Sequence, residues 1–173
     1  MIRPAARAAL ALAVPVLTVA ALGAPASAAA PVVYHGQGAT VHRASGQVDH
    51  RLAETPRAFR SFVRTRLDQI WGWTDNDPAC AQAPLVVVKE VRSKVAYISD
   101  EGSFPGGPGG APDSCATGGN YHFFVKRDGA WKAPRALGGQ DVMSCRTFRR
   151  WDIPRMSGAH QCWDGEDVVR WDG

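Results

Sequence analysis

The chain lacks the repeats and the composition that define several classes of protein. Its 173 residues contain neither a G-X-Y repeat nor a continuous heptad pattern, which excludes a collagen-like or coiled-coil structure. Hydrophobic residues make up 45% of the chain and aromatic residues 9%, too much for a wholly disordered protein. Because this length supports one hydrophobic core and not two, we predict a single globular domain.

Motifs that carry catalysis or bind nucleotides are also missing. The chain has no G-x-S-x-G motif, and no Lys-Ser/Thr pair follows the glycine-rich segment 102–112, which is therefore no P-loop. The same segment does not match the G-x-G-x-x-G fingerprint of dinucleotide-binding proteins, because its prolines interrupt the pattern and no helix begins there. The sequence therefore indicates no catalytic residues and no cofactor, and it favours a protein that is not an enzyme.

No residues are spaced as metal ligands. The cysteines form no C-x₂₋₄-C pair, and His160 is the one histidine close to a cysteine, Cys162. His35, His42 and His50 recur in a segment that we expect to lack the rigid support of a metal site. We therefore predict no metal.

The N-terminus has the pattern of a secretory signal. Arg3 and Arg7 precede an apolar run over 8–22, and Ala26-Ser27-Ala28 is a cleavage site of the A-x-A type. The run is shorter than the roughly 20 residues of a membrane-spanning helix. We therefore predict that residues 1–28 are a signal peptide, that the protein is secreted, and that it does not span the membrane after cleavage.

Loss of the signal also changes the charge. The net charge of +4 includes Arg3 and Arg7, so 18 basic and 16 acidic residues remain, a net charge of 18 − 16 = +2. A value so close to zero gives no reason to expect a nucleic-acid partner. For a secreted protein, we expect the partner to be an extracellular protein or a component of the cell wall.

Cysteines are few, but their number is even. In an exported chain four cysteines indicate two disulfides, for which three pairings exist. The sequential pairing is favoured because each pair then brackets a compact segment; it joins Cys80 to Cys115 and Cys145 to Cys162.

The hydrophobic pattern predicts an α+β fold. Apolar residues at helical spacing predict one amphipathic helix from Thr55, the expected N-cap, to Trp71, with Arg64 paired to Asp68 on its exposed side. Runs rich in β-branched and aromatic residues predict an antiparallel meander of about four strands over 85–91, 94–100, 120–127 and 130–137, with a tight turn at Asp128-Gly129. A short helix over 142–151 and a last strand over 168–171 complete a disulfide-tied C-terminal turn.

Between the signal and the helix the chain is polar and shows no sustained period. We therefore expect residues 29–54 to be a flexible N-terminal arm, and residues 55–173 to form the disulfide-bonded α+β domain.

Four side chains are candidates for facing a ligand. His122 lies in the middle of a predicted strand between aromatic residues, and Tyr97 lies in the neighbouring strand. Trp163 and Trp171 lie beside acidic residues near the C-terminus, where exposed aromatic rings form a stacking surface for a sugar or a peptide.

The C-terminal half resembles small exported actinobacterial proteins without an assigned activity. The resemblance covers residues 59–162 and rests on the KRDGAW segment at 126–131, Cys145, the Ile153-Pro154 step and Cys162. The strand, the Asp-Gly turn and the tryptophan of the return strand also resemble the cone-shaped NTF2-like fold. Neither resemblance supplies catalytic residues.

These patterns lead to one principal hypothesis and two alternatives. The principal one is an exported, non-catalytic binding domain or cell-envelope-associated domain. The first alternative is a secreted protease inhibitor that uses the segment 102–114 ahead of Cys115. The second is an NTF2-like ligand binder or enzyme with a pocket on its concave sheet face, into which His122 or Tyr97 points.

Overall fold

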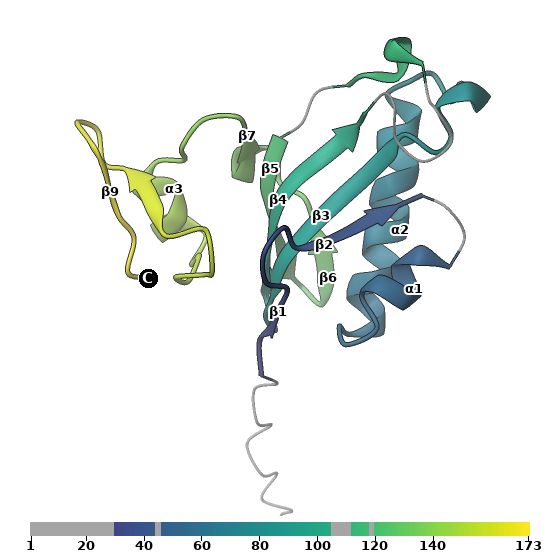
Figure 1. The fold of residues 1–173 in the computed structure, drawn as a ribbon. Coiled ribbons are helices and arrows are strands. Elements are labelled where there is room, and N and C mark those ends of the chain that lie inside the picture. The colour runs from purple at the N-terminus through teal and green to yellow at the C-terminus, as the bar shows by residue number, and fades with distance from the viewer. Residues whose placement is uncertain (1–29, 44–45, 105–111, 118–119) are drawn as a thin grey trace, which may run out of the picture.

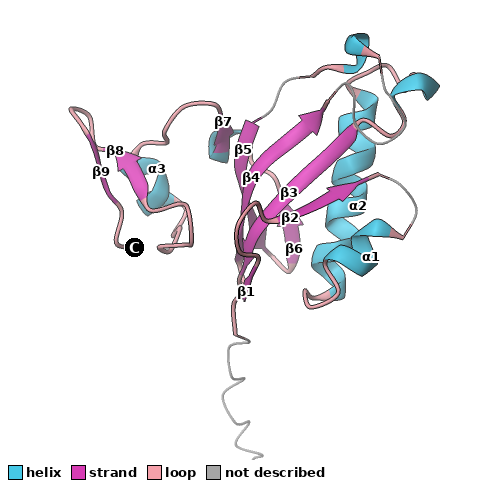
Figure 2. Cartoon of the chain, viewed as in Figure 1, coloured by secondary structure: helices cyan, strands magenta, loops and turns pink. Residues whose placement is uncertain are grey.

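A computed structural model describes residues 30–43, 46–104, 112–117 and 120–173 of the chain (Figures 1 and 2). The predicted signal peptide lies outside these residues, as does most of the glycine-rich segment proposed as an inhibitor loop. In the described part of the chain, no helix has both the length and the apolar character that crossing a membrane requires.

The structure confirms the α+β class and the antiparallel sheet. Seven strands form this sheet in the order β1-β3-β4-β5-β6, with β2 also paired to β3 and β7 to β5. The strands are β1 (Val32–Val33), β2 (Ala39–His42), β3 (Pro84–Val91), β4 (Val95–Ser103), β5 (Asn120–Arg127), β6 (Ala130–Lys132) and β7 (Gly138–Gly139). The helices are α1 (Gln47–Arg51), α2 (Arg57–Gly72) and α3 (Cys145–Arg150), and β8 (Gln161–Trp163) pairs with β9 (Val168–Arg170).

The turn between β5 and β6 forms as its sequence predicts. Asp128 and Gly129 have φ angles of 53° and 78°, the left-handed backbone of a type I′ turn. The return strand is shorter than predicted, because β6 ends at Lys132 and a 3₁₀ turn occupies Arg135–Leu137. Pro134 directly precedes that turn and has no N–H with which to continue the ladder.

The predicted helix corresponds to α2, but it begins differently. Thr55 is not the N-cap; Pro56 occupies that position. The Thr55 hydroxyl instead donates to the Leu52 carbonyl at 2.8 Å, and the side chain is buried. On the exposed side Arg64 pairs with Asp49 and not with Asp68, whose carboxylate accepts from Arg43 at 2.8 Å.

α2 covers one face of the sheet (Figure 1). Its buried residues are Phe59, Val63, Leu67 and Ile70, which recur at helical spacing. They pack with Val86 and Val88 of β3, Ala96 and Ile98 of β4, Phe124 of β5 and Trp131 of β6 in one hydrophobic core. Phe59 meets Trp131 edge to face, with ring centroids 4.9 Å apart.

The described residues between 30 and 54 are part of the fold, which corrects the expected flexible arm. β2 pairs with β3 from Ala39 opposite Val88 to His42 opposite Leu85, and β1 pairs with the other end of β3. The side chains of Val41 and Leu52 are fully buried in the same core as the apolar side chains of α2. The strands are too short to show a periodic pattern, and the core that stabilises them comes from residues far along the chain.

The last part of the chain, residues 140–173, covers part of the opposite face, and we call it the C-terminal unit. Its buried side chains include Phe148, Ile153 and Met156, which pack on Val95, Phe123 and Val125 of the sheet. Because these strands have alternating side chains, Phe123 and Val125 face the C-terminal unit while Phe124 faces α2. The sheet therefore lies between two separate hydrophobic cores.

Both predicted disulfides are present, in the sequential pairing. Cys80 is bonded to Cys115 beside the C-terminal end of α2, and Cys145 is bonded to Cys162 within the C-terminal unit. The second bond joins the first residue of α3 to the middle of β8. It therefore links α3 directly to β8 within the C-terminal unit.

A buried carboxylate attaches the C-terminal unit to β3. Glu90 accepts a hydrogen bond from the Ser157 backbone N–H at 2.6 Å and a second from the Arg92 guanidinium. The same guanidinium donates to the Arg155 carbonyl at 2.7 Å. The charge of Glu90 is therefore compensated although its side chain is excluded from water.

Candidate binding site between the sheet and the C-terminal unit

A cavity of about 170 Å³ lies between the sheet and the C-terminal unit. Its floor consists of Tyr97 of β4 and Phe123 of β5, and Phe148 of α3 contributes a third ring. The remaining walls come from two short stretches of the C-terminal unit: Gln140, Val142, Met143, Gly158, Ala159, His160 and Gln161.

The three aromatic rings hold each other in place. Tyr97 stacks on Phe123 with centroids 5.3 Å apart, and Phe123 meets Phe148 edge to face at 5.2 Å. Tyr97 and Phe123 are directly opposite each other in the register of β4 and β5. Cross-strand aromatic pairs of this kind stabilise a sheet and present a rigid apolar surface.

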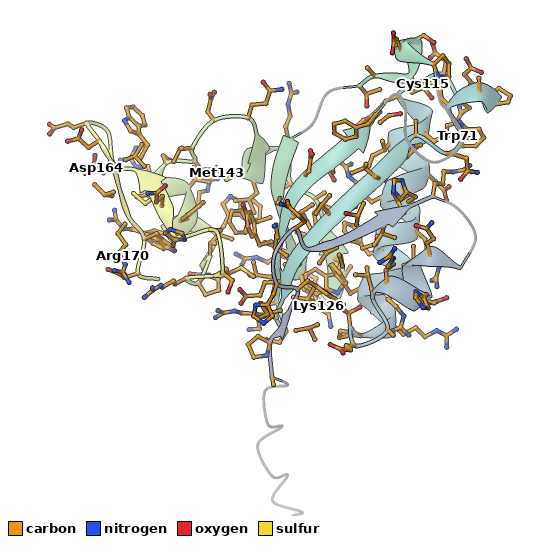
Figure 3. The ribbon with its side chains drawn as sticks, in the orientation of Figure 1. Trp71, Cys115, Lys126, Met143, Asp164 and Arg170 are labelled. Atoms are coloured by element: carbon orange, nitrogen blue, oxygen red, sulfur yellow. A yellow bond between two sulfur atoms is a disulfide. The ribbon has the colours of Figure 1, made fainter. Side chains whose placement is uncertain are left out.

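The wall of the C-terminal unit is fixed by backbone hydrogen bonds and a helix cap. The Trp163 N–H donates to the Met143 carbonyl at 2.9 Å, which holds Met143 beside β8 in the connection that leads to α3 (Figure 3). The hydroxyl of Ser144 accepts from the Thr147 N–H at 3.1 Å and so caps α3. Ser144 therefore has a structural role at the start of the helix.

Gly158 is closely packed against the floor. Its φ angle is +80°, and a Cβ at this position would lie 3.4 Å from Cε1 of Tyr97. Any other residue would therefore be strained in its backbone, and its Cβ would lie in van der Waals contact with the tyrosine ring. Glycine allows the chain to approach Tyr97 closely enough to form the edge of the cavity.

Burial raises the pKa of Tyr97 above its ordinary value of 10.0. The folded protein thus holds the phenolic proton more tightly than the unfolded chain does. The stabilisation that this difference gives is fully present below the pKa of the tyrosine in the unfolded chain. It is lost as the pH rises through the higher pKa of Tyr97 in the folded protein. At neutral pH the phenol is a neutral group that can donate a hydrogen bond to a ligand.

Replacing Tyr97 with phenylalanine is expected to make the fold less sensitive to alkali. Above about pH 10 the wild-type protein loses stability as buried tyrosine ionises, and the variant lacks this contribution. Urea unfolding between pH 8 and pH 11 measures the slope of the unfolding free energy against pH. Tyr34, whose pKa is also raised by burial, continues to titrate in the variant, so the slope is expected to be reduced and not abolished. Equal slopes in both proteins would contradict the prediction.

The structure separates the four candidate ligand-facing residues. Tyr97 lines the cavity, whereas Trp163 is 47% exposed on β8. Trp171 is not exposed as expected: its side chain is 8% exposed, packs on Phe148, and donates its indole N–H to the Ile153 carbonyl at 2.9 Å. His122 lies in β5, but its side chain is outside the described part of the structure.

Most of the cavity was not visible in the sequence. The sequence predicts Phe148 as an inward-facing residue of a short helix, but it does not single out Met143, and Gly158 lies in a segment without any period. The one available signal was the cysteine pair, which indicates that the segments around Cys145 and Cys162 lie together.

The lining residues suit the binding of a group that is largely uncharged. Three aromatic rings and Met143 provide apolar contact area, and the side chains of Gln140, His160 and Gln161 provide polar groups at the rim. The described lining includes no carboxylate beside His160, so it offers no Asp/Glu–His pair for proton transfer. Elsewhere in the described residues, no three His, Cys, Asp or Glu side chains form a cluster that could hold a metal ion.

Comparisons with family models, with curated proteins and with solved structures find no significant match to this chain. The resemblance to small exported actinobacterial proteins therefore stays a prediction.

Proposed function

We propose that the protein is an exported, non-catalytic binding domain whose ligand site is the cavity around Tyr97. The observation that carries this proposal is a preformed aromatic cavity with a polar rim, built by the sheet and the C-terminal unit. A buried carboxylate links these two parts, and a disulfide stabilises the C-terminal unit itself. Small-molecule sites commonly have this combination of apolar walls and a few polar groups. The signal-like N-terminus and the two disulfides support the exported location.

The size and lining of the cavity define the class of group that fits. A volume of about 170 Å³ is below the usual range for drug-sized ligands, so we expect it to accept a single aromatic or branched aliphatic group. Such a group can be a free small molecule or a side chain of a larger partner. The phenol of Tyr97 and the amide of Gln161 provide hydrogen bonds to a polar atom on the group.

A titration with aromatic probes tests the proposal. Adding p-cresol or indole to the ¹⁵N-labelled protein is expected to shift the amide signals of residues 142–143 and 158–161 in a saturable way. For probes of this size we expect dissociation constants of roughly millimolar order. Cyclohexanol serves as a probe of similar size without an aromatic ring.

Two matched variants show whether the shifts come from the cavity. Val142 lies at the mouth and is 43% exposed, so Val142→Trp is expected to obstruct the cavity without disturbing the core and to weaken probe binding at least tenfold. Val168 of β9 is 51% exposed and does not line the cavity, so Val168→Trp is the control and is expected to bind as the wild type does. Absence of saturable shifts, or an equal loss in both variants, would overturn the proposal.

A further inference from the structure

A second hollow adjoins the aromatic cavity on the other side of Tyr97. Its volume is about 410 Å³, and Tyr97 and Gly158 line both hollows. The rest of its lining comes from the connection between β1 and β2, from Lys89 of β3, from Ser99 of β4 and from Ser157 of the C-terminal unit. We call it the polar hollow.

The register of the sheet places the two hollows side by side on one face. β1, β3, β4 and β5 are neighbours in the sheet (Figure 1). Val33 of β1 lies opposite Glu90 of β3, and Glu90 lies opposite Tyr97 of β4. Tyr97 in turn lies opposite Phe123 of β5. Because side chains at opposite positions of antiparallel strands share a face, this row runs from Phe123 in the cavity past Tyr97 to Val33 in the polar hollow.

The side chain of Lys89 lies on the same face, although a register shift interrupts the alternation of β3 at this point. Val87 alternates with Val88, which belongs to the core under α2, so Val87 faces away from α2. A Cβ built on Gly38 would lie 3.3 Å from Cγ1 of Val87 and 2.9 Å from Cδ of Lys89, so the lysine chain runs beside Val87. Its Nζ donates to the Gly36 carbonyl at 2.7 Å, and Gly36 itself lines the polar hollow. The ammonium group therefore has a defined position at the edge of this hollow.

The polar hollow has a positive charge that its own lining does not balance. The described lining contains Lys89 but no Asp or Glu, and Lys89 forms no ion pair with a described side chain. Glu90, the buried carboxylate of the same row, already accepts hydrogen bonds from Arg92 and from the Ser157 N–H. The hydroxyls of Ser99 and Ser157 add hydrogen-bond donors. This combination favours an anionic group.

We infer that the ligand of the proposed site is an aromatic acid, with its ring in the aromatic cavity and its carboxylate beside Lys89 in the polar hollow. A short chain between ring and carboxylate passes over the edge at which Tyr97 and Gly158 meet. The carboxylate accepts a charge-assisted hydrogen bond from the ammonium group. This inference rests on the proposed function and deepens it, because it specifies the charge and shape of a ligand that the cavity alone defines only by one apolar group.

A titration with 3-(4-hydroxyphenyl)propionate at pH 7.5 tests the inference. The matched probe is the amide of the same acid, which has the same shape but no charge. The acid is expected to bind the ¹⁵N-labelled protein at least fivefold more tightly than the amide, and to shift the backbone signals of residues 35–36, 89 and 99 in addition to those around the cavity. 4-Hydroxybenzoate, whose carboxylate is attached directly to the ring, is too short to pass Tyr97 and is expected to bind at least fivefold more weakly than the propionate. Equal binding of these two acids would contradict the position of the carboxylate.

Two lysine variants with equal changes in charge show where the carboxylate binds. Lys89→Gln is expected to reduce the advantage of the acid over the amide to less than twofold, while p-cresol binding stays unchanged and shows that the variant is folded. The control is Lys94→Gln, because Lys94 is exposed in the turn between β3 and β4 and lines neither hollow. It is expected to retain the full advantage of the acid. An advantage that persists in Lys89→Gln would place the carboxylate on another group, such as His160 at the rim of the cavity, and would overturn the inference.

The probe p-cresol separates a failure of this inference from a failure of the proposed function, because it has a ring but no carboxylate. Saturable p-cresol binding together with equal affinities of the acid and its amide would overturn only the assignment of an aromatic acid. Absence of binding by both p-cresol and the acid would overturn the proposed function and this inference with it. Val142→Trp, which obstructs the cavity, is expected to weaken binding of the acid at least tenfold. Unchanged binding in this variant would contradict the position of the ring.

Discussion

Replacing Arg66 with alanine is expected to lower the free energy of unfolding by about 3–5 kcal/mol. Arg66 projects from α2 onto the sheet, where both oxygens of the Glu101 carboxylate accept hydrogen bonds from its guanidinium, one of them at 3.0 Å. Glu101 is fully buried, and the Arg66 guanidinium forms an ion pair with its carboxylate. Without it, a carboxylate that stays ionised is left in a region of low dielectric constant, and a carboxylate that becomes protonated loses the ion pair.

A matched control on the same helix isolates the effect of burial. Arg64 pairs with Asp49, but both side chains are substantially exposed to water. Exposed pairs contribute at most about 1 kcal/mol, so Arg64→Ala is expected to have a small effect. The midpoint and slope of urea unfolding measure both variants. A loss below about 1 kcal/mol in Arg66→Ala would contradict the importance of the buried pair.

A double variant separates two contributions to the unfolding free energy: the stabilisation by the ion pair, and the cost of leaving one of its charges buried alone. Arg66→Met/Glu101→Leu removes both charges and fills the space with apolar side chains. We expect it to be more stable than Arg66→Ala by at least about 2 kcal/mol, because the Glu101 carboxylate is no longer buried without the guanidinium of Arg66. A double variant as unstable as Arg66→Ala would show that packing, and not charge, accounts for the loss.

The local pattern of this sequence predicts its elements better than their partners. Leu85 to Val91, rich in β-branched residues, forms β3, and the amphipathic pattern from Phe59 to Ile70 forms α2. The partner of Arg66 could not be found in the same way, because Glu101 is 35 positions away and faces the helix only after a register shift between Ile98 and Glu101 in β4. A bulge changes which residues face the core without leaving a clear sign in the sequence.

The N-terminal residues show a related limit of prediction. β1 and β2 are two and four residues long, so neither contains a measurable hydrophobic period. Their position depends on hydrogen bonds to β3, about 50 residues later in the chain. A segment that is polar on one side and pairs at an edge looks, in sequence, like a loosely attached arm.

The candidate site was only partly predictable for the same reason. Tyr97 alternates with core residues along β4, so its place on the face opposite α2 follows from the strand pattern. What covers that face comes from residues 140–161, which contain little regular structure. The expectation that Trp171 is exposed was wrong because adjacent acidic residues indicate nothing about the indole itself, which completes the second core.

Removing the Cys145–Cys162 disulfide is expected to destabilise the C-terminal unit by roughly 3 kcal/mol. The two cysteines are 17 positions apart, and closing a loop of this length removes about that much conformational entropy from the unfolded chain. Cys145→Ala/Cys162→Ala also removes two buried sulfurs from the core formed with Phe123 and Phe148. Since α2 and β3 belong to the other core, we expect the loss to be local.

Hydrogen exchange and probe binding together measure whether this loss is local. In Cys145→Ala/Cys162→Ala, the amides of α3 and β8 are expected to exchange at least tenfold faster, those of α2 and β3 to change little, and p-cresol binding to weaken. The matched control removes the Cys80–Cys115 disulfide, whose 35-residue separation corresponds to nearly 4 kcal/mol. Because that bond lies beside α2 and away from the cavity, the control is expected to lose overall stability but to retain p-cresol binding while folded. In Cys145→Ala/Cys162→Ala, equally faster exchange in both cores would show that the sheet and the C-terminal unit unfold together. It would contradict the prediction that the loss of stability is local.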